Sequence, residues 1–245
     1  MSTPIDEFSR FAHQYNQYNI IQTEVAQTLI SEFSRKYYRY IVDIGCGNGA
    51  VYRNIQKQNI SYDTFMVLDS SKEMLSLHPD GINIKKIHAD FNRPEAYKNF
   101  YLKKEETVLF SASALQWSRD LDFVFSHLAS LANDAYFAIF TSGTFRTLHL
   151  LAGIESPIYT QEQLQKSIGR YYKATFTLKS YKLAFKTVQD MFRYIKKSGV
   201  SGGKKQLSYT QTKRVMQMYP LDYLEFEVLY VKATSLVGEQ EKADA

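Results

Sequence analysis

Cysteine is almost missing from this chain: its 245 residues contain one, Cys46. A single thiol excludes an internal disulfide and leaves no thiolate cluster for zinc. No run approaches the ~18–20 apolar residues that a membrane-spanning helix needs. Residues 1–7 also lack the positive region and apolar stretch of a secretory signal. We therefore expect a cytoplasmic protein with no membrane partner.

Prolines are few as well, and the five that occur fall at expected element boundaries. No Pro/Gly/Ser-rich linker, internal repeat or low-complexity tract divides the chain. A hydrophobic content of 44% supports a sizeable core. Length and pattern together predict a single domain over residues 1–245.

Positive charge exceeds negative charge, with a net value of +5 and a pI of about 9. Four lysine pairs contribute, at 85–86, 103–104, 196–197 and 204–205. Such pairs are most often solvated surface, and the alternative is attraction to an acidic partner. No nucleic-acid-binding motif accompanies them. An acidic carrier protein remains a candidate partner, and nucleic acid is not expected.

Apolar runs predict alternating strands and helices. Strands are expected at 40–44, 64–68, 82–87, 108–110, 136–140, 175–183 and 224–231, and helices near 21–33, 121–132, 188–197 and 213–218. Alternation of this kind implies right-handed crossovers and a mostly parallel sheet with helices on both faces. The expected sheet has seven strands, with a helical insertion between the last two.

The most informative segment runs from Tyr40 to Gly49 and reads YIVDIGCGNG. It predicts a buried strand that turns sharply into a helix, where Gly45, Gly47 and Gly49 let backbone N–H groups approach a ligand closely. The glycine spacing alone also satisfies a dinucleotide fingerprint. Asp43 disfavours that alternative, because a carboxylate beside the turn repels a pyrophosphate and attracts a cationic ligand such as S-adenosylmethionine.

Three more polar positions follow predicted strands, where ligands of open α/β sheets bind. Asp69 stands 24 positions after Gly45, a spacing suited to ribose hydroxyls, and its alternative role is to cap a helix beginning near Ser71. Asp90 is a candidate acceptor for the adenine amino group, with Phe91 packing against the base, unless the pair forms an ordinary loop turn. Ser111 is expected to face the same cleft.

Together these positions resemble the class I S-adenosylmethionine-dependent methyltransferase family over residues 36–145. The resemblance implies a Rossmann-like fold and S-adenosylmethionine as cofactor. It departs at residues 132–134, where Ala-Asn-Asp replaces the usual glycine-rich turn. The cofactor-binding residues that it implies are Tyr15, Gln22, Asp43, Gly45, Gly47, Gly49, Asp69, Ser70, Met74, Asp90, Phe91 and Ser111.

The flanking segments are similar to the malonyl-acyl carrier protein O-methyltransferases of biotin synthesis. The aromatic segment 8–15 followed by Gln22, the Leu-Gln-Trp at 115–117 and the Gly-Thr-x-x-x-Leu at 143–148 carry this resemblance. It implies methylation of the free carboxylate of a malonyl thioester, on acyl carrier protein or coenzyme A. Arg146 is then placed to anchor that carboxylate, with a solvent-exposed arginine as the alternative.

Tyr15 and Trp117 complete the predicted catalytic set, and both could instead be packing residues. Gln22 either binds the cofactor carboxylate or faces solvent. No metal-ligand spacing is present. A monomer or weak dimer is expected. The regions expected within the single domain are a helical cap at 1–35, the cofactor core at 36–145, a helical connection at 146–174, late strands at 175–234 with a lid insertion at about 186–220, and a disordered tail at 235–245.

Other functions stay open at this point. The main alternative is methylation of a free acid such as trans-aconitate, which would need no carrier protein. A nucleic-acid methyltransferase lacks its base-methylation motif after the fourth strand, where residues 111–114 read Ser-Ala-Ser-Ala. A dehydrogenase is disfavoured by Asp43, and a binding module without activity by the intact set of cofactor positions.

Overall fold

The computed structural model describes residues 18–98, 100–197 and 207–237. Along the chain the helices and strands are α3 (Ile20–Ser31), β1 (Tyr37–Ile44), α4 (Ala50–Lys57), β2 (Ser61–Asp69), α5 (Lys72–Leu77), β3 (Ile84–His88), η2 (Pro94–Tyr97), η3 (Lys104–Glu106), β4 (Thr107–Ala112), η4 (Leu115–Trp117), α6 (Leu121–Leu131), β5 (Asp134–Phe140), α7 (Arg146–Ala152), α8 (Gln161–Tyr171), β6 (Tyr172–Ala184), α9 (Val188–Lys197), α10 (Tyr209–Met218) and β7 (Tyr223–Ser235).

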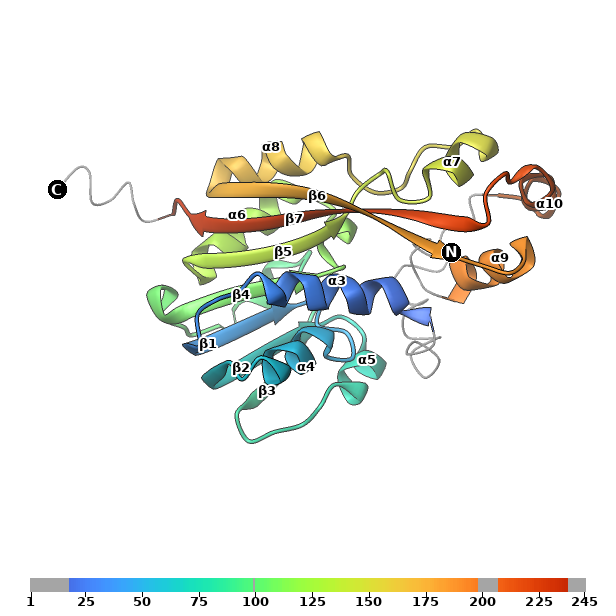
Figure 1. The fold of residues 1–245 in the computed structure, drawn as a ribbon. Helices are drawn as coiled ribbons and strands as arrows, with labels where there is room; N and C mark the ends of the chain where they lie inside the picture. Colours follow the sequence, from blue (N-terminus) through green and yellow to red (C-terminus); the bar gives the residue numbers. More distant parts are fainter. Residues whose placement is uncertain (1–17, 99, 198–206, 238–245) are drawn as a thin grey trace.

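One sheet of seven strands organises the molecule, in the order β3-β2-β1-β4-β5-β7-β6 (Figure 1). The first five strands in chain order pair in parallel, whereas β7 runs antiparallel to both β5 and β6. The predicted fold class, a mostly parallel seven-stranded α/β sheet, is confirmed. The last two strands are longer than predicted, because β6 already pairs from Tyr172, opposite Ser235 at the end of β7.

Two apolar layers cover the sheet, one on each face. In β5, Tyr136, Ala138 and Phe140 belong to the layer that contains α3 and α4. Their neighbours Ala135, Phe137 and Ile139 belong to the layer that contains α6 and α8. Alternation along a strand buried on both sides is the pattern expected for a central strand of a parallel sheet.

Helices α7, α9 and α10 gather at the end of the sheet where the parallel strands finish (Figure 1). Helix α7 follows β5, and α9 and α10 lie between β6 and β7 in the chain. Helix α10 begins at Tyr209, earlier than the apolar pattern predicts, because Ser208 and Gln211 form a capping box that starts the helix. This end of the sheet is where the candidate site is built.

Candidate functional site

The strand order reverses between β1 and β4, so the loops after these strands diverge and leave room for a ligand. The turn after β1 fills this switch point. Its backbone is fixed by the N–H groups of Gly45 and Cys46, which both donate to the carbonyl of Leu68 at 2.8 and 3.0 Å. The turn then leads directly into α4, whose N-cap is Gly49.

All three glycines of this turn are required by conformation, and Gly45 and Gly49 are required by space as well. Gly45, Gly47 and Gly49 have φ values of 70°, 52° and 92°, which L side chains rarely adopt. A Cβ atom on Gly45 would lie 2.2 Å from the Cβ of Ala114. The turn therefore presents bare backbone to the space at the end of β1.

Asp43, the penultimate residue of β1, is fully buried. Neither of its carboxylate oxygens has a hydrogen-bond partner in the part of the chain that the structure describes. Burial raises the pKa of Asp43 well above its usual range, and the nearby Asp69 carboxylate raises it further. A buried acceptor without a donor is costly, and a cationic ligand would relieve that cost. The buried carboxylate of Asp43 therefore fits the positively charged sulfonium and ammonium groups of the predicted cofactor.

Asp69 ends β2 and faces the glycine turn. Its Oδ2 accepts from the N–H of Gly47 at 2.8 Å, and its Oδ1 accepts from the N–H of Ser71 at 2.9 Å. Burial raises the pKa of Asp69, and the backbone donors partly offset that rise. The cap of α5 is Ser71, whose hydroxyl accepts from the N–H of Met74. Asp69 thus supports the start of α5 and also borders the ligand space.

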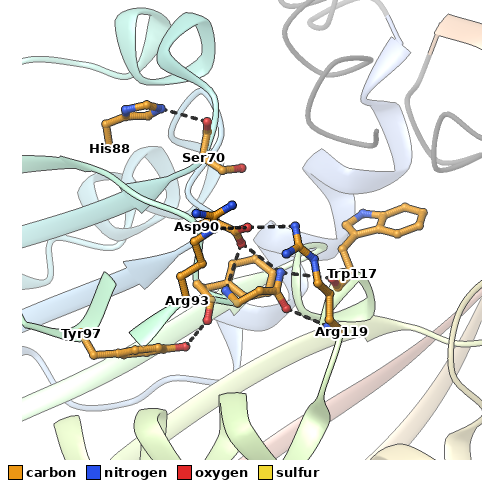
Figure 2. A network of polar contacts seen from close by, with 9 residues as sticks. Ser70, His88, Asp90, Arg93, Tyr97, Trp117 and Arg119 are labelled. Carbon is orange, nitrogen blue, oxygen red and sulfur yellow. Dashed lines mark hydrogen bonds and ion pairs between the residues drawn. The ribbon is translucent and has the colours of Figure 1, made fainter. Parts of the chain in front are cut away.

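Ser70 and Met74 lie beside Asp69, one on each side of the start of α5. The carbonyl of Ser70 is 3.0 Å from Nε2 of His88, which joins the ends of β2 and β3 (Figure 2). The side chain of Met74 is buried, and its Cε would be 3.8 Å from a Cβ on Gly47. The structure thus places Met74 against the glycine turn, whereas the contact of Ser70 is toward β3.

Asp90 lies in the loop after β3, and its side chain is 13% exposed. Its Oδ1 accepts from the backbone and side-chain nitrogens of Asn92, each at 3.0 Å. Its Oδ2 is paired with Arg119 at 3.2 Å (Figure 2). Phe91 is buried in the layer that contains α6 and α8, and its carbonyl accepts from the hydroxyl of Tyr97. The carboxylate of Asp90 thus already has Asn92 and Arg119 as partners, and its Oδ2 can still accept another hydrogen bond.

The hydroxyl of Ser111 is bonded to the neighbouring strand, and whether this residue borders the cofactor stays a prediction. Ser111 is fully buried, and its hydroxyl donates to the carbonyl of Ile44 at 2.7 Å. This bond joins β4 to the end of β1, at the point where the loops that follow these two paired strands diverge.

Two predicted residues come from the segment before β1. Gln22 on α3 is buried, so the alternative that it faces solvent is wrong, and its Oε1 has no partner in the described part of the chain. Tyr15 lies outside the described residues. Gln22 therefore supplies another unpaired oxygen beneath the surface, and its role toward the cofactor stays a prediction.

The Leu-Gln-Trp segment forms the short helix η4 after β4. Ser113 precedes it with a φ of 62°, a strained value for a serine, and its N–H donates to the carbonyl of Ala138 at 2.8 Å. Gln116 Nε2 donates to the carbonyl of Ser113 at 2.7 Å. The indole of Trp117 points away from Asp90 (Figure 2), and its Nε1 is buried without a partner among the described residues.

Arg146 begins α7 and is exposed. Within the described residues no hydrogen bond or ion pair of its guanidinium is found. Phe145, the residue before it, has a φ of 57° and packs edge-on against Phe226 at a centroid distance of 5.1 Å. That packing stabilises the strained backbone from which the arginine projects.

The loop that leads to Arg146 is held by two acidic residues of β7. Glu225 Oε2 accepts from the N–H of Thr147 at 2.9 Å, and Glu227 Oε1 accepts from the hydroxyl of Thr141. A Cβ on Gly143 would lie 2.4 Å from Glu227 Oε1. The Glu227 carboxylate thus holds the loop before Arg146, and the Glu225 carboxylate holds the first turn of α7 just after it. Sequence reasoning missed them, because nothing in the chain order signals that β7 lies beside β5.

Within residues 18–98, 100–197 and 207–237, no group of three or more His, Cys, Asp or Glu is arranged to hold a metal ion. None of the helices in those same ranges is both long and apolar enough to cross a membrane.

The fold is that of the class I methyltransferases. The chain matches one chain of the Haloferax volcanii complex between the Trm112 methyltransferase activator and a methyltransferase, with a TM-score of 0.60, 11% identity and coverage of 96% of this chain and 99% of that one. It also matches phosphoethanolamine N-methyltransferase 2 of Haemonchus contortus, solved with S-adenosyl-L-methionine, with a TM-score of 0.58, 12% identity and coverage of 96% and 60%. Likeness at such low identity shows the fold alone.

Sequence relatives point to one kind of enzyme within that fold. The malonyl-[acyl-carrier protein] O-methyltransferase of Bacteroides helcogenes is 24% identical over 233 residues, covering 82% of this chain and 83% of the relative. The protein of the same name from Bacillus cytotoxicus is 24% identical over 250 residues, covering 88% and 83%. No family model matches the chain. The resemblance that the sequence motifs predict is thereby confirmed.

Proposed function

We propose that this protein transfers the methyl group of S-adenosylmethionine to the free carboxylate of a malonyl thioester on acyl carrier protein. The product is the methyl ester that enters pimeloyl, and hence biotin, synthesis, and we propose the cytoplasm as its compartment. The observation that carries the proposal is the likeness to malonyl-[acyl-carrier protein] O-methyltransferases over more than four fifths of both chains.

The enzyme class and the cofactor do not depend on which acceptor is methylated. The fold and the relatives named O-methyltransferases both support an S-adenosylmethionine-dependent methyltransferase, with S-adenosylmethionine as its cofactor. The glycine turn and the buried, unpaired carboxylate of Asp43 agree with that assignment. When bound, the cofactor supplies an electrophilic methyl group on a positively charged sulfur.

The protein contributes to catalysis by positioning the malonyl carboxylate against the methyl donor and by excluding water from both. A malonyl carboxylate is already ionised near neutral pH, so no general base is needed to activate it. Arg146 would pair with this carboxylate and leave oxygen lone pairs free to accept the methyl group of the cofactor. Proximity and orientation supply up to ~7–11 kcal/mol in well-ordered systems.

The end of the molecule around α7 and α10 supports an acidic carrier as partner. The two helices contact each other, and their sequences contain no aspartate or glutamate. Arg146, Lys213 and Arg214 are exposed on them. Leu150 and Met218 are exposed as well, by 71% and 50%. Basic side chains with apolar neighbours beside the acceptor loop are suited to an acidic protein that delivers a thioester arm.

A parallel assay tests the proposal. Malonyl-acyl carrier protein, malonyl-coenzyme A, malonate and trans-aconitate are each offered with methyl-labelled S-adenosylmethionine, and the labelled methyl ester is measured. We expect the carrier-bound substrate to give the highest kcat/KM. Turnover of trans-aconitate that exceeds turnover of both thioesters would instead identify a free-acid methyltransferase.

Charge reversal locates the carrier. The double substitution Lys213→Glu, Arg214→Glu should raise KM for malonyl-acyl carrier protein by about 10-fold or more, because close opposite charges become like charges. KM for a short malonyl thioester without carrier should stay unchanged. Lys173→Glu is the matched control, because Lys173 is exposed on β6 opposite Thr234, near the far end of β7. Equal effects on both substrates would exclude this surface as the carrier site.

A further inference from the structure

Asn92 connects two loops that carry different parts of the proposed site. Its Nδ2 donates to Asp90 Oδ1 at 3.0 Å and lies 3.4 Å from the carbonyl of Trp117. Its Oδ1 accepts from the backbone N–H of Arg119 at 2.7 Å. One amide side chain thus uses donor and acceptor together, toward the loop after β3 on one side and the segment after β4 on the other.

The two loops do not come from neighbouring strands. β3 and β4 are separated in the sheet by β2 and β1. The contacts of Asn92 therefore pass across the ends of the two strands that carry Asp69 and the glycine turn. A bridge in this place fixes the distance between the predicted adenine acceptor, Asp90, and the Leu-Gln-Trp segment.

A second bridge runs beside the first. Arg119 Nη2 is 3.2 Å from Asp90 Oδ2, and Arg93 Nε is 4.0 Å from the same oxygen (Figure 2). The side chains of Arg119 and Arg93 are 64% and 68% exposed, and exposed ion pairs hold geometry weakly. The amide bridge, with three partners in defined positions, is the stronger constraint.

We infer that Asn92 is a positioning residue that sets the Asp90 carboxylate for adenine and at the same time holds Trp117 in the acceptor segment. This inference rests on the cofactor part of the proposed function and not on its acceptor, because it takes Asp90 as the adenine acceptor. Its consequence is that cofactor binding and the environment of Trp117 are coupled through one side chain, so that a change at residue 92 alters both.

The chain offers a direct readout, since Trp117 is its only tryptophan. In the wild type, addition of S-adenosylhomocysteine should change the emission of Trp117 and its quenching by acrylamide. Asn92→Leu, which keeps the size and removes the hydrogen bonds, should weaken S-adenosylhomocysteine binding roughly tenfold. It should also raise acrylamide quenching of Trp117 before any ligand is added.

Asn92→Asp separates positioning from a general effect on folding. While it is protonated, the introduced carboxyl group still donates to Asp90, whereas two adjacent ionised carboxylates repel each other. The other groups that face Asp90 are Arg93, Arg119 and Tyr97; the two arginines carry positive charge, and Tyr97 stays neutral because burial raises its pKa. The ratio of variant to wild-type affinity for S-adenosylhomocysteine should therefore be highest at the acid end of the pH range in which the fold is stable, and should fall as the pH rises and the introduced carboxyl group ionises.

Asn83→Asp is the matched control, because Asn83 is exposed just before β3, and its affinity ratio should stay flat. The inference is overturned if Asn92→Asp follows the wild-type pH profile, or if Asn92→Leu leaves affinity and quenching unchanged. Failure of the proposed function looks different. A wild type that binds S-adenosylhomocysteine but does not methylate malonyl thioesters leaves this inference standing.

Discussion

Asp43 is the residue whose replacement best tests the cofactor site. The change is Asp43→Asn, which keeps the shape of the side chain and removes its charge. In the cofactor-free protein the carboxyl group is fully buried, has no partner in the described structure, and has a strongly raised pKa. A cation that arrives beside it favours ionisation, so cofactor binding should release a proton from Asp43.

The size of the effect follows from two opposing terms. At a contact distance of about 4 Å and an effective dielectric constant of about 20, a cation and a carboxylate attract by about 4 kcal/mol. Each pH unit by which the pKa exceeds the working pH costs about 1.4 kcal/mol to ionise the group first. This ionisation cost offsets part of the attraction, so Asp43→Asn should weaken cofactor affinity by less than the roughly 1,000-fold to which about 4 kcal/mol corresponds.

Calorimetry in buffers of different ionisation enthalpy counts the protons. Wild-type protein should release protons on binding S-adenosylmethionine between pH 5 and 8, and Asp43→Asn should release fewer. The ammonium group of the cofactor titrates equally in both experiments, so the difference belongs to Asp43. Asp63→Asn, at the exposed start of β2, is the control. Equal affinity and equal proton release in wild type and Asp43→Asn would refute the reasoning.

Three further predictions address the rest of the site. Gly45→Ala should destabilise the fold by about 2–5 kcal/mol in urea unfolding, because it combines a positive φ with a collision; Gly153→Ala has a similar φ and open space, so a loss as large there would contradict the collision. Arg146→Ala should abolish turnover of malonyl-acyl carrier protein while S-adenosylmethionine Kd stays within about twofold, and retained turnover would remove Arg146 from the mechanism. Burial lowers the pKa of His78, so the folded state binds its proton less readily than the unfolded state does, and stability is lost as pH falls below the ordinary value of about 6.5. His78→Gln should therefore show a smaller drop in Tm from pH 7.5 to 5.5 than the wild type; an equal drop would rule out His78 as a cause.

Local patterns sufficed to predict the cofactor half of the fold. The run from Tyr40 to Gly49 carries its own physical consequences, because consecutive apolar residues require burial and alternating glycines require a tight turn. Asp69 and Asp90 could be placed from their positions at strand ends, since the carboxyl ends of parallel strands meet at one edge. Side-chain direction was less predictable, as the buried hydroxyl of Ser111 shows.

The acceptor half depends on contacts between residues far apart in the chain, which periodicity does not reveal. Glu225 and Glu227 hold the loop before Arg146 only because β7 inserts beside β5 in antiparallel orientation. Asn92 reads in the sequence as an ordinary turn residue before Arg93-Pro94. Its partners Trp117 and Arg119 lie 25 and 27 positions away, across two strands of the sheet.

Asp43 and Asp90 differ in how they would respond to a bound cofactor, and the electrostatics of Asp43 explain the difference. A group whose folded pKa is raised contributes stability below its unfolded pKa, and this is lost as pH rises through the folded value. Near neutral pH, therefore, Asp43 is a buried acid whose ionisation a nearby cation would favour, whereas Asp90 already has Asn92 and Arg119 as partners. Charge pairing at Asp43 should then supply most of the linkage between binding and stability. Adenine contacts at Asp90 should add specificity with little gain in stability, and adenosine, which lacks the cationic end, should raise the Tm far less than S-adenosylmethionine at equal saturation.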